Sequence, residues 1–317
     1  MARSDRRLHS SNSAVGPSAA PATRRCGRAT DAIFERDIAT FYFDDGALGG
    51  SSGRALPPAW HARFRADFFR ELAAVGRWAA ERRWYPSAIA DLRVLVGDRY
   101  VISRSLVPAW YGHSGHMEFP AGRAIAGQAA IAHELTHVLF PNGNRLLAEG
   151  LAVYLQAEIG GNPAFPNFGR PLHELARQRL REMAPRIKSG DPGSLDDVRL
   201  SELDKVATPA PLELRVGADF YGEEPRGQTR IYALAGSFVA FLIETRGQER
   251  FRALFERTPL VPRERDGGSP GRWTEVYGRS LADLELEWKT LMVSPGAAVT
   301  GEDGPAGLDG THDSSEP

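Results

Sequence analysis

The sequence predicts an α+β protein, with a small mixed or antiparallel sheet near the N-terminus and a mainly helical C-terminal part. Two observations support this prediction. Short runs rich in β-branched and aromatic residues lie in the first 120 residues, whereas apolar residues recur at helical spacing from about Ala124 onward. A strand-rich region that precedes a helical region is typical of the α+β class.

The expected strands are short, and a long helix separates the first from the others. Strand candidates are "DIATFYFDD" (37–45), "LRVLVG" and "RYVIS" (within 92–103) and "GHMEFP" (115–120). The last of them ends at a proline, which cannot continue a ladder of hydrogen bonds. Residues 59–84 are expected to form an amphipathic helix, because apolar residues recur there at helical spacing with arginines between them.

Helical patterns dominate the rest of the chain. The expected helices span residues 124–139, 145–158, 171–184, 229–246, 248–257 and 280–292. Gly247 suits the end of the longest of them, and Ser280 with Asp283 resembles a capping box. Residues 185–228 are rich in Pro, Gly and Asp, which predicts a region of loops.

The two ends of the chain lack any periodic pattern. Residues 1–34 are rich in Ser, Ala, Pro and Arg, and residues 294–317 are acidic and rich in Gly. Both are predicted to be disordered tails that flank one domain over residues 35–293. The arginines near Met1 are not followed by an apolar segment, so no signal peptide is expected. The sequence as given therefore fits a cytoplasmic protein, export is possible if the start is misassigned, and the localisation stays open.

Composition excludes several classes of protein. The net charge is −1, which gives no general affinity for nucleic acid or anionic membranes. The single cysteine, Cys26, excludes an internal disulfide framework and a zinc site built from cysteines. No apolar run is long enough to span a bilayer. The oligomeric state is not predicted.

Three ionisable residues interrupt the apolar stretch "AIAHELTHVLF" (130–140). His133 and His137 are one helical turn apart, about 6 Å along the axis, so both imidazoles can converge on one ion. Glu134 lies beside them and can reach a water on that ion without replacing a ligand. The pattern predicts a metal site; the alternative is two core histidines bonded to backbone or carboxylate groups.

A third ligand is expected, because catalytic zinc sites take three protein ligands and leave one position open. The segment "LLAEGLAVYL" is apolar nearly all round except for Glu149, which predicts a buried helix. Asn144, after a strong turn signal, is the expected N-cap of that helix. A buried carboxylate requires a positive partner, and a divalent cation shared with the two histidines would supply it.

"HELTH" followed by "LLAEGLAVY" resembles the gluzincin zinc metallopeptidases. Residues 231–255 and 276–292 resemble the C-terminal part of bacterial peptidase-MA-like domains, so the resemblance covers roughly residues 36–292. It implies a gluzincin-like zincin domain and Zn²⁺ as the cofactor. By position, His133, His137 and Glu149 would be the zinc ligands. Glu134 would be the general base that activates a water for hydrolysis of a peptide or protein substrate.

The chain also departs from this family. Only eleven residues separate His137 from Glu149, fewer than in thermolysin-like or aminopeptidase-N-like enzymes. Val153 stands where thermolysin-like proteins have an aspartate that partners a ligand histidine, so the partner of that histidine is not predicted. In the family a Tyr or His often stabilises the oxyanion. Tyr232 is the candidate here, with Tyr154 and Tyr221 as alternatives and a core role equally open for each.

Two further interpretations remain open at the level of sequence. "GHMEF" resembles the strand of aminopeptidase-N-like enzymes whose glutamate binds the substrate's amino group; Glu118 would take that role, but an edge-strand glutamate is the simpler interpretation. The domain could also bind zinc without catalysis and serve as a peptide- or envelope-binding module. The leading prediction is a zinc metallopeptidase with catalytic Glu134 and Tyr232.

Overall fold

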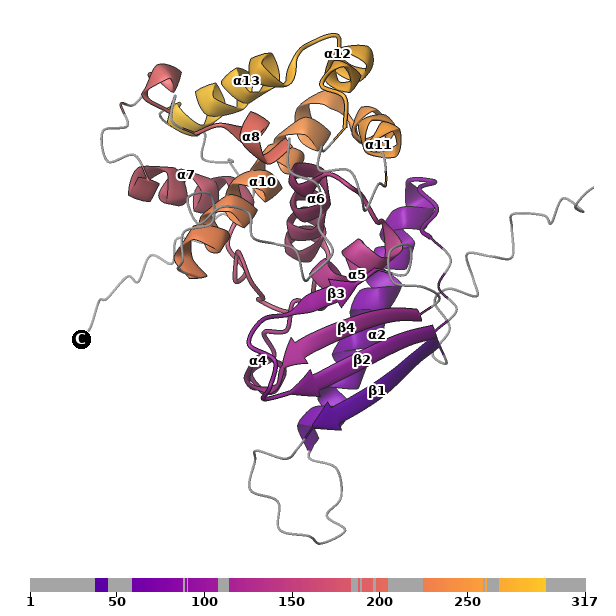
Figure 1. Cartoon of the computed structure of the whole chain (residues 1–317). Coiled ribbons are helices and arrows are strands. Elements are labelled where there is room, and N and C mark those ends of the chain that lie inside the picture. The colour runs from indigo at the N-terminus through magenta and orange to yellow at the C-terminus, as the bar shows by residue number, and fades with distance from the viewer. Residues whose placement is uncertain are drawn as a thin grey trace, which may run out of the picture.

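The computed structural model describes residues 38–44, 59–87, 89, 91–107, 114–183, 188, 190–195, 198–204, 225–258, 260 and 268–294. Within them, a sheet in the N-terminal part is followed by a mainly helical remainder (Figure 1). The α+β class is therefore confirmed. The tails predicted over residues 1–34 and 294–317 lie outside the described residues, except for Ser294, which is the C-cap of α13.

The sheet has four strands in the order β1-β2-β4-β3. β1 (Ala39–Asp44), β2 (Asp91–Gly97) and β4 (Ser114–Pro120) are parallel to one another, and β3 (Arg104–Leu106) pairs antiparallel with β4. The expected mixed sheet is thus confirmed. β3 is an edge strand and also contacts α5 (Ile131–Leu139), which carries the paired histidines.

One face of the sheet packs against α2 (Ala59–Glu81) (Figure 1). Alternate residues of the strands point to this face because the side-chain period of a strand is two. They meet aromatic side chains of α2, which recur at helical spacing. This layer of the core includes Phe64, Phe68, Val94, Met117 and Phe119.

The strand predicted over residues 99–103 is wrong. These residues form a turn and bends, and Val101 is 89% exposed. The strand in this region is β3, which begins one residue later, at Arg104. β-branched composition alone does not make a strand without a partner strand and a surface to bury. Here the partner, β4, selects the residues that pair.

The single helix predicted over residues 124–139 is also wrong. It is divided into α4 (Ala121–Ala126) and α5, and Gly127 ends α4 in the left-handed conformation with φ +68°. Glycine adopts that conformation without a steric penalty, so it terminates the helix. The paired histidines therefore lie in the first and second turns of a short helix.

The remaining expected helices are confirmed, with ends shifted by a few residues at most. They are α6 (Arg145–Glu158), α7 (Leu172–Met183), α10 (Pro225–Arg246), α11 (Gln248–Arg257) and α13 (Leu281–Val293). The caps at Asn144 and Ser280 are also confirmed. Three short elements were not predicted: the 3-10 helix Pro192–Leu195, α8 (Leu200–Asp204) and α12 (Gly271–Tyr277).

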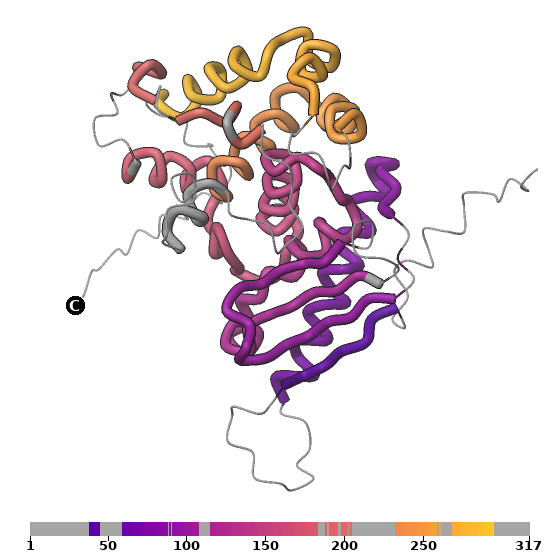
Figure 2. The backbone as a smooth tube through the Cα atoms, in the orientation of Figure 1, coloured from indigo at the N-terminus to yellow at the C-terminus, as the bar shows by residue number. Residues whose placement is uncertain are grey.

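α5 and α6 lie between the sheet and the C-terminal helices (Figures 1 and 2). α6 packs closely against α10 through two glycines. A Cβ atom on Gly236 would lie 2.2 Å from Cγ1 of Val153, and one on Gly150 would lie 2.4 Å from Cγ2 of Val239. The absence of a side chain at both positions therefore permits this close approach. No helix in the described part of the chain is long and apolar enough to cross a membrane.

Candidate metal centre

The side chains of three predicted metal ligands, which come from two helices, lie close together. His133 and His137 lie on α5, and Glu149 lies in the second turn of α6. The two Nε2 atoms are 3.2 Å apart, and each is 3.3 Å from Oε2 of Glu149. The three atoms thus form a nearly equilateral triangle. All three residues are largely or wholly buried, with exposed side-chain fractions of 6%, 14% and 5%.

This triangle fits a metal ion with tetrahedral geometry. Bonds of about 2.0–2.1 Å from zinc to nitrogen or oxygen place neighbouring ligand atoms of a tetrahedron about 3.3 Å apart. Two imidazoles and one carboxylate are also ligands that zinc accepts readily. His133, His137 and Glu149 therefore form a group that could hold a metal ion.

Arg145 lies at the other oxygen of Glu149. Its Nη1 is 3.0 Å from Oε1 of Glu149, and Arg145 precedes Glu149 by one turn of α6. Burial by itself raises the pKa of this carboxyl group, but Arg145 and the two histidines together hold the pKa well below its ordinary value. Glu149 therefore stays ionised, as a ligand must be.

Glu134 is buried but does not belong to the triangle. Its Oε2 accepts a hydrogen bond of 2.5 Å from Oγ of Ser105, which also lies 2.9 Å from the Glu134 carbonyl oxygen. Burial raises the pKa of Glu134 to about 7, although His133 and the hydrogen bond from Ser105 oppose the rise. A carboxyl group with a pKa near neutrality is suited to accept and return a proton.

Residues from distant elements hold the start of α5. Its N-cap position is Ala130, which offers no side-chain acceptor. Oε2 of Glu71 on α2 accepts from the backbone N–H of Ala132 at 2.7 Å, and Oε1 of Gln156 on α6 accepts from that of His133 at 3.1 Å. These bonds satisfy N–H groups that a helix cannot pair within itself. They also attach the first turn of α5, which carries the first candidate ligand, to both neighbouring helices.

Nδ1 of His133 is buried and makes no hydrogen bond to any residue that the structure describes. Val153 stands where thermolysin-like proteins have the aspartate that partners a ligand histidine, and the sequence indicated no other residue for that role. In the described ranges of the chain, that partner is still not identified.

Tyr232 lies at the centre, as its candidate role requires. Its ring is in edge contact with that of His133, with 5.9 Å between the ring centroids. Its hydroxyl oxygen accepts a hydrogen bond of 2.8 Å from Nη2 of Arg145. Tyr154 is five residues beyond Glu149 on α6, a rotation of roughly 140° about the helix, and lines a different part of the surface. Tyr221 lies outside the described residues.

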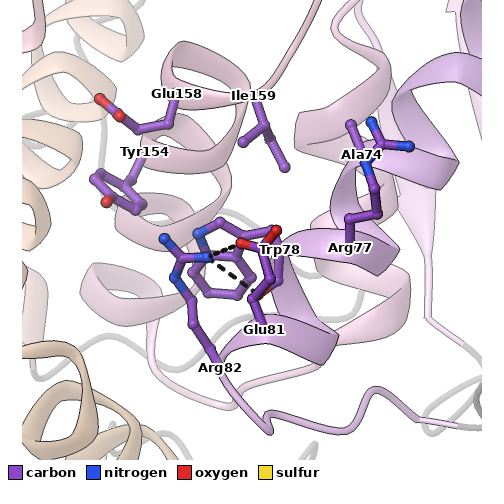
Figure 3. Close-up of a pocket in the computed structure, with 8 residues that line it drawn as sticks. All are labelled: Ala74, Arg77, Trp78, Glu81, Arg82, Tyr154, Glu158 and Ile159. Carbon is purple, nitrogen blue, oxygen red and sulfur yellow. Dashed lines mark hydrogen bonds and ion pairs between the residues drawn. The ribbon is translucent and has the colours of Figure 1, made fainter.

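The pocket that Tyr154 lines is separate from the three ligands. It has a volume of about 430 Å³ and lies between the last turns of α2 and α6 (Figure 3). Its lining residues are Ala74, Arg77, Trp78, Glu81, Arg82, Tyr154, Glu158 and Ile159. None of the predicted metal ligands is among them, so this pocket does not contribute to the metal centre.

Glu118 does not lie on an edge strand, since β4 is interior to the sheet. Its carboxylate pairs with Arg104, and its Oε1 is 3.0 Å from Nε2 of His116. Adjacent residues of a strand point to opposite faces, and Met117 packs in the core with α2, so Glu118 projects from the other face. Arg104 and His116 already pair with the carboxylate of Glu118. The structure therefore does not present this carboxylate as a free partner for a substrate's amino group.

No family model matches the chain, and no curated protein matches it significantly. The resemblance to gluzincins therefore depends on the motif residues of the sequence alone.

Sequence patterns did not identify four residues of the site, namely Arg145, Ser105, Glu71 and Gln156. Arg145 had a visible signal, because it lies four residues before Glu149 and so on the same side of the helix. Ser105 and Glu71 contact α5 across 29 and 61 positions of the sequence. No local pattern reports contacts of that range.

Proposed function

We propose that the protein is a zinc metallopeptidase that hydrolyses peptide bonds. The observation that carries this proposal is the position of Glu134. It follows directly after one member of a three-ligand cluster, yet its own carboxylate lies outside that cluster. A site that only stored or bound zinc would have no need of a buried fourth ionisable group beside it.

The proposed roles divide among a few side chains. A bound zinc ion would act as a Lewis acid and would lower the pKa of its bound water to about 7. Glu134 takes the proton of the attacking water and passes it to the leaving amine. Ser105 donates to Oε2 of Glu134, which leaves Oε1 to face the water. The hydroxyl of Tyr232 donates to the carbonyl oxygen as charge develops on it.

The substitution Glu134→Gln tests this proposal. It should leave zinc binding unchanged but abolish hydrolysis of a mixed peptide library, because the amide cannot accept the proton of the water. The measurement compares zinc content and peptide turnover of the purified variant with those of wild type. Glu275→Gln, at an exposed glutamate on α12, is the matched control and should retain full turnover. Full activity of Glu134→Gln would refute the mechanism.

The alternative is a zinc-bound domain that binds peptides without cleaving them. One observation favours it: Ser105 contacts both the carboxylate and the backbone carbonyl of Glu134, which is also an arrangement that would stabilise a purely structural glutamate. Turnover of the same library by wild-type protein, abolished by a chelator and restored by zinc, excludes this alternative. Zinc binding without any turnover would favour it.

A further inference from the structure

The two oxygens of the Glu149 carboxylate have different partners. Oε2 faces the Nε2 atoms of both histidines at 3.3 Å. Oε1 faces Nη1 of Arg145 at 3.0 Å, and both side chains are nearly buried, with exposed fractions of 11% for Arg145 and 5% for Glu149. An oxygen that is paired with a guanidinium at this distance is a poor ligand for a second cation. The carboxylate therefore presents one oxygen to the centre.

The same guanidinium contacts a second residue of the site. Nη2 of Arg145 donates to the hydroxyl oxygen of Tyr232 at 2.8 Å. Since the guanidinium is rigid and planar, the positions of its two nitrogens are not independent. Glu149 and Tyr232, which are on different helices, are thereby held in one fixed arrangement. Because Tyr232 accepts from Arg145, its own O–H has to point away from the arginine.

We propose that Arg145 is a positioning residue that joins the third metal ligand to the candidate oxyanion donor. Through Nη1 it makes Glu149 a ligand by Oε2 alone, and through Nη2 it orients the hydroxyl of Tyr232. A simpler role is neutralisation of the buried charge of Glu149. The two roles differ in one respect: neutralisation requires a positive charge, whereas positioning requires the two-pronged shape of the guanidinium.

The substitution Arg145→Lys separates these roles, because it keeps the charge but removes the fork. We expect zinc affinity, measured by competition with a chelator, to fall about 10- to 100-fold, the usual effect of losing a partner of a metal ligand. X-ray absorption of the zinc-loaded proteins should report one oxygen of Glu149 on the ion in wild type. In the variant it should report a second, longer oxygen contact.

A matched control exists on the surface. Arg170 and Glu174 have the same spacing of four residues and the same distance, 3.0 Å, but their side chains are exposed, by 40% and 58%. Arg170→Lys should leave zinc affinity unchanged. The melting temperature of each zinc-free variant shows whether it is folded. An affinity of Arg145→Lys within twofold of wild type, in a folded protein, overturns the proposal in favour of charge neutralisation.

The link to Tyr232 is tested by a double-mutant cycle with zinc affinity as the readout. Tyr232→Phe removes an acceptor of the guanidinium and should weaken zinc binding by about threefold, a modest coupling between residues in contact. In the Arg145→Lys background the same change should have no effect. Equal effects in both backgrounds would show that Arg145 does not connect the two residues.

The inference rests on the proposed zinc site, and the outcomes distinguish the two. Wild-type protein that binds no zinc refutes both. Wild-type protein that binds zinc and loses it on Arg145→Lys, but cleaves no peptide, retains the inference and refutes the peptidase. If wild-type protein cleaves peptides in a zinc-dependent way and Arg145→Lys has the zinc affinity of wild type, the peptidase proposal is retained and the inference about Arg145 is refuted.

Discussion

At the scale of single residues, the carboxylates of Glu149 and Glu134 are each held through one of their two oxygens. Arg145 holds Oε1 of Glu149, and Ser105 holds Oε2 of Glu134. The other oxygen of each group is left for its proposed task, metal ligation in the first case and proton transfer in the second. A carboxylate with one fixed oxygen loses rotational freedom before the reaction, which is how an active site reduces the entropy cost of catalysis.

Ser105→Ala should lower kcat for peptide hydrolysis by about tenfold, since a hydrogen bond to a charged group contributes about 1.5 kcal/mol or more. KM and zinc affinity should not change, because Ser105 contacts neither the ligands nor the proposed site of the metal. Steady-state kinetics on one peptide substrate measures the effect.

Ser105→Thr keeps the hydroxyl and should restore most of the activity, which separates loss of the hydrogen bond from a packing defect. Ser294→Ala, at the exposed end of α13, is the control. A variant Ser105→Ala with wild-type kcat would mean that Glu134 is positioned by other contacts.

At the scale of elements, α5 is a short helix that depends on its neighbours. It has nine residues and no side-chain cap of its own. Glu71 from α2 and Gln156 from α6 accept its first free N–H groups instead. Helices of this length are marginal in isolation, so tertiary contacts have to stabilise it. The paired histidines are consequently placed by three helices together.

The stability of the protein should depend on pH through Glu71, whose pKa burial raises from 4.5 to about 7 despite the bond from Ala132. The folded protein holds this proton more tightly than the unfolded chain. The stabilising contribution is therefore complete below about pH 4.5 and is lost as the pH rises through 7. Relative to Glu71→Gln, the free energy of unfolding of wild type should fall by about 2–3 kcal/mol between pH 5 and pH 8.

Urea unfolding of the zinc-free proteins at several pH values measures this difference. The amide oxygen of the glutamine keeps the acceptor for the N–H of Ala132, so the comparison isolates the charge. Glu275→Gln, at an exposed position, should show no such trend. A difference between wild type and Glu71→Gln that is constant with pH would contradict the prediction.

The crossing of α6 and α10 depends on the absence of a side chain at Gly236. A methyl group there would meet Cγ1 of Val153 at 2.2 Å and its Cβ at 2.8 Å, and a β-branched neighbour in a helix has little freedom to move. Gly236→Ala should therefore destabilise the protein by about 1–3 kcal/mol, although alanine favours a helix. The free energy of unfolding in urea measures this cost.

Gly122 in α4 provides the contrast, because a Cβ atom there would meet nothing within 4 Å. Gly122→Ala should be neutral or stabilising by up to about 1 kcal/mol. Similar effects of the two substitutions would mean that helix propensity, and not the crossing, decides the result.

At the scale of the whole molecule, the centre lies where the sheet layer and the helical part meet. The hydrophobic core of the described residues is one cluster, which extends from α2 and the strands through α6 and α10 to α13. The ligands belong to α5 and α6, which lie within this cluster. A metal ion bound there would join α5 to α6 inside this cluster, so its binding should be linked to the stability of the whole.

Removal of zinc should lower the melting temperature. Free zinc at a hundredfold excess over its Kd adds about 2.7 kcal/mol to the folded state, which corresponds to about 5–10 °C for a domain of this size. Thermal unfolding with added zinc and with a chelator measures the shift. His137→Ala should melt at the same temperature under both conditions. A wild-type protein without any shift would contradict a zinc site.

Several features of this protein follow from the sequence alone. The spacing of His133 and His137, the helix that carries Glu149 and the caps at Asn144 and Ser280 depend on interactions within one or two helical turns. Such interactions are the same wherever the helix lies in the fold. For this reason the sequence was enough to predict the three ligand candidates. It also predicted the long helices with nearly correct bounds, except for the one that is divided into α4 and α5.

Other features were decided only by tertiary structure. The antiparallel edge strand is Arg104–Leu106 and not residues 99–103, because strand identity depends on a partner that the local pattern does not contain. Tyr232 and Arg145 meet across 87 positions of the sequence, and Glu71 and Ala132 across 61. Contacts of that range exist only once the sheet layer and the helices pack together, and it is this packing that surrounds the motif's own histidines and glutamate with their partners.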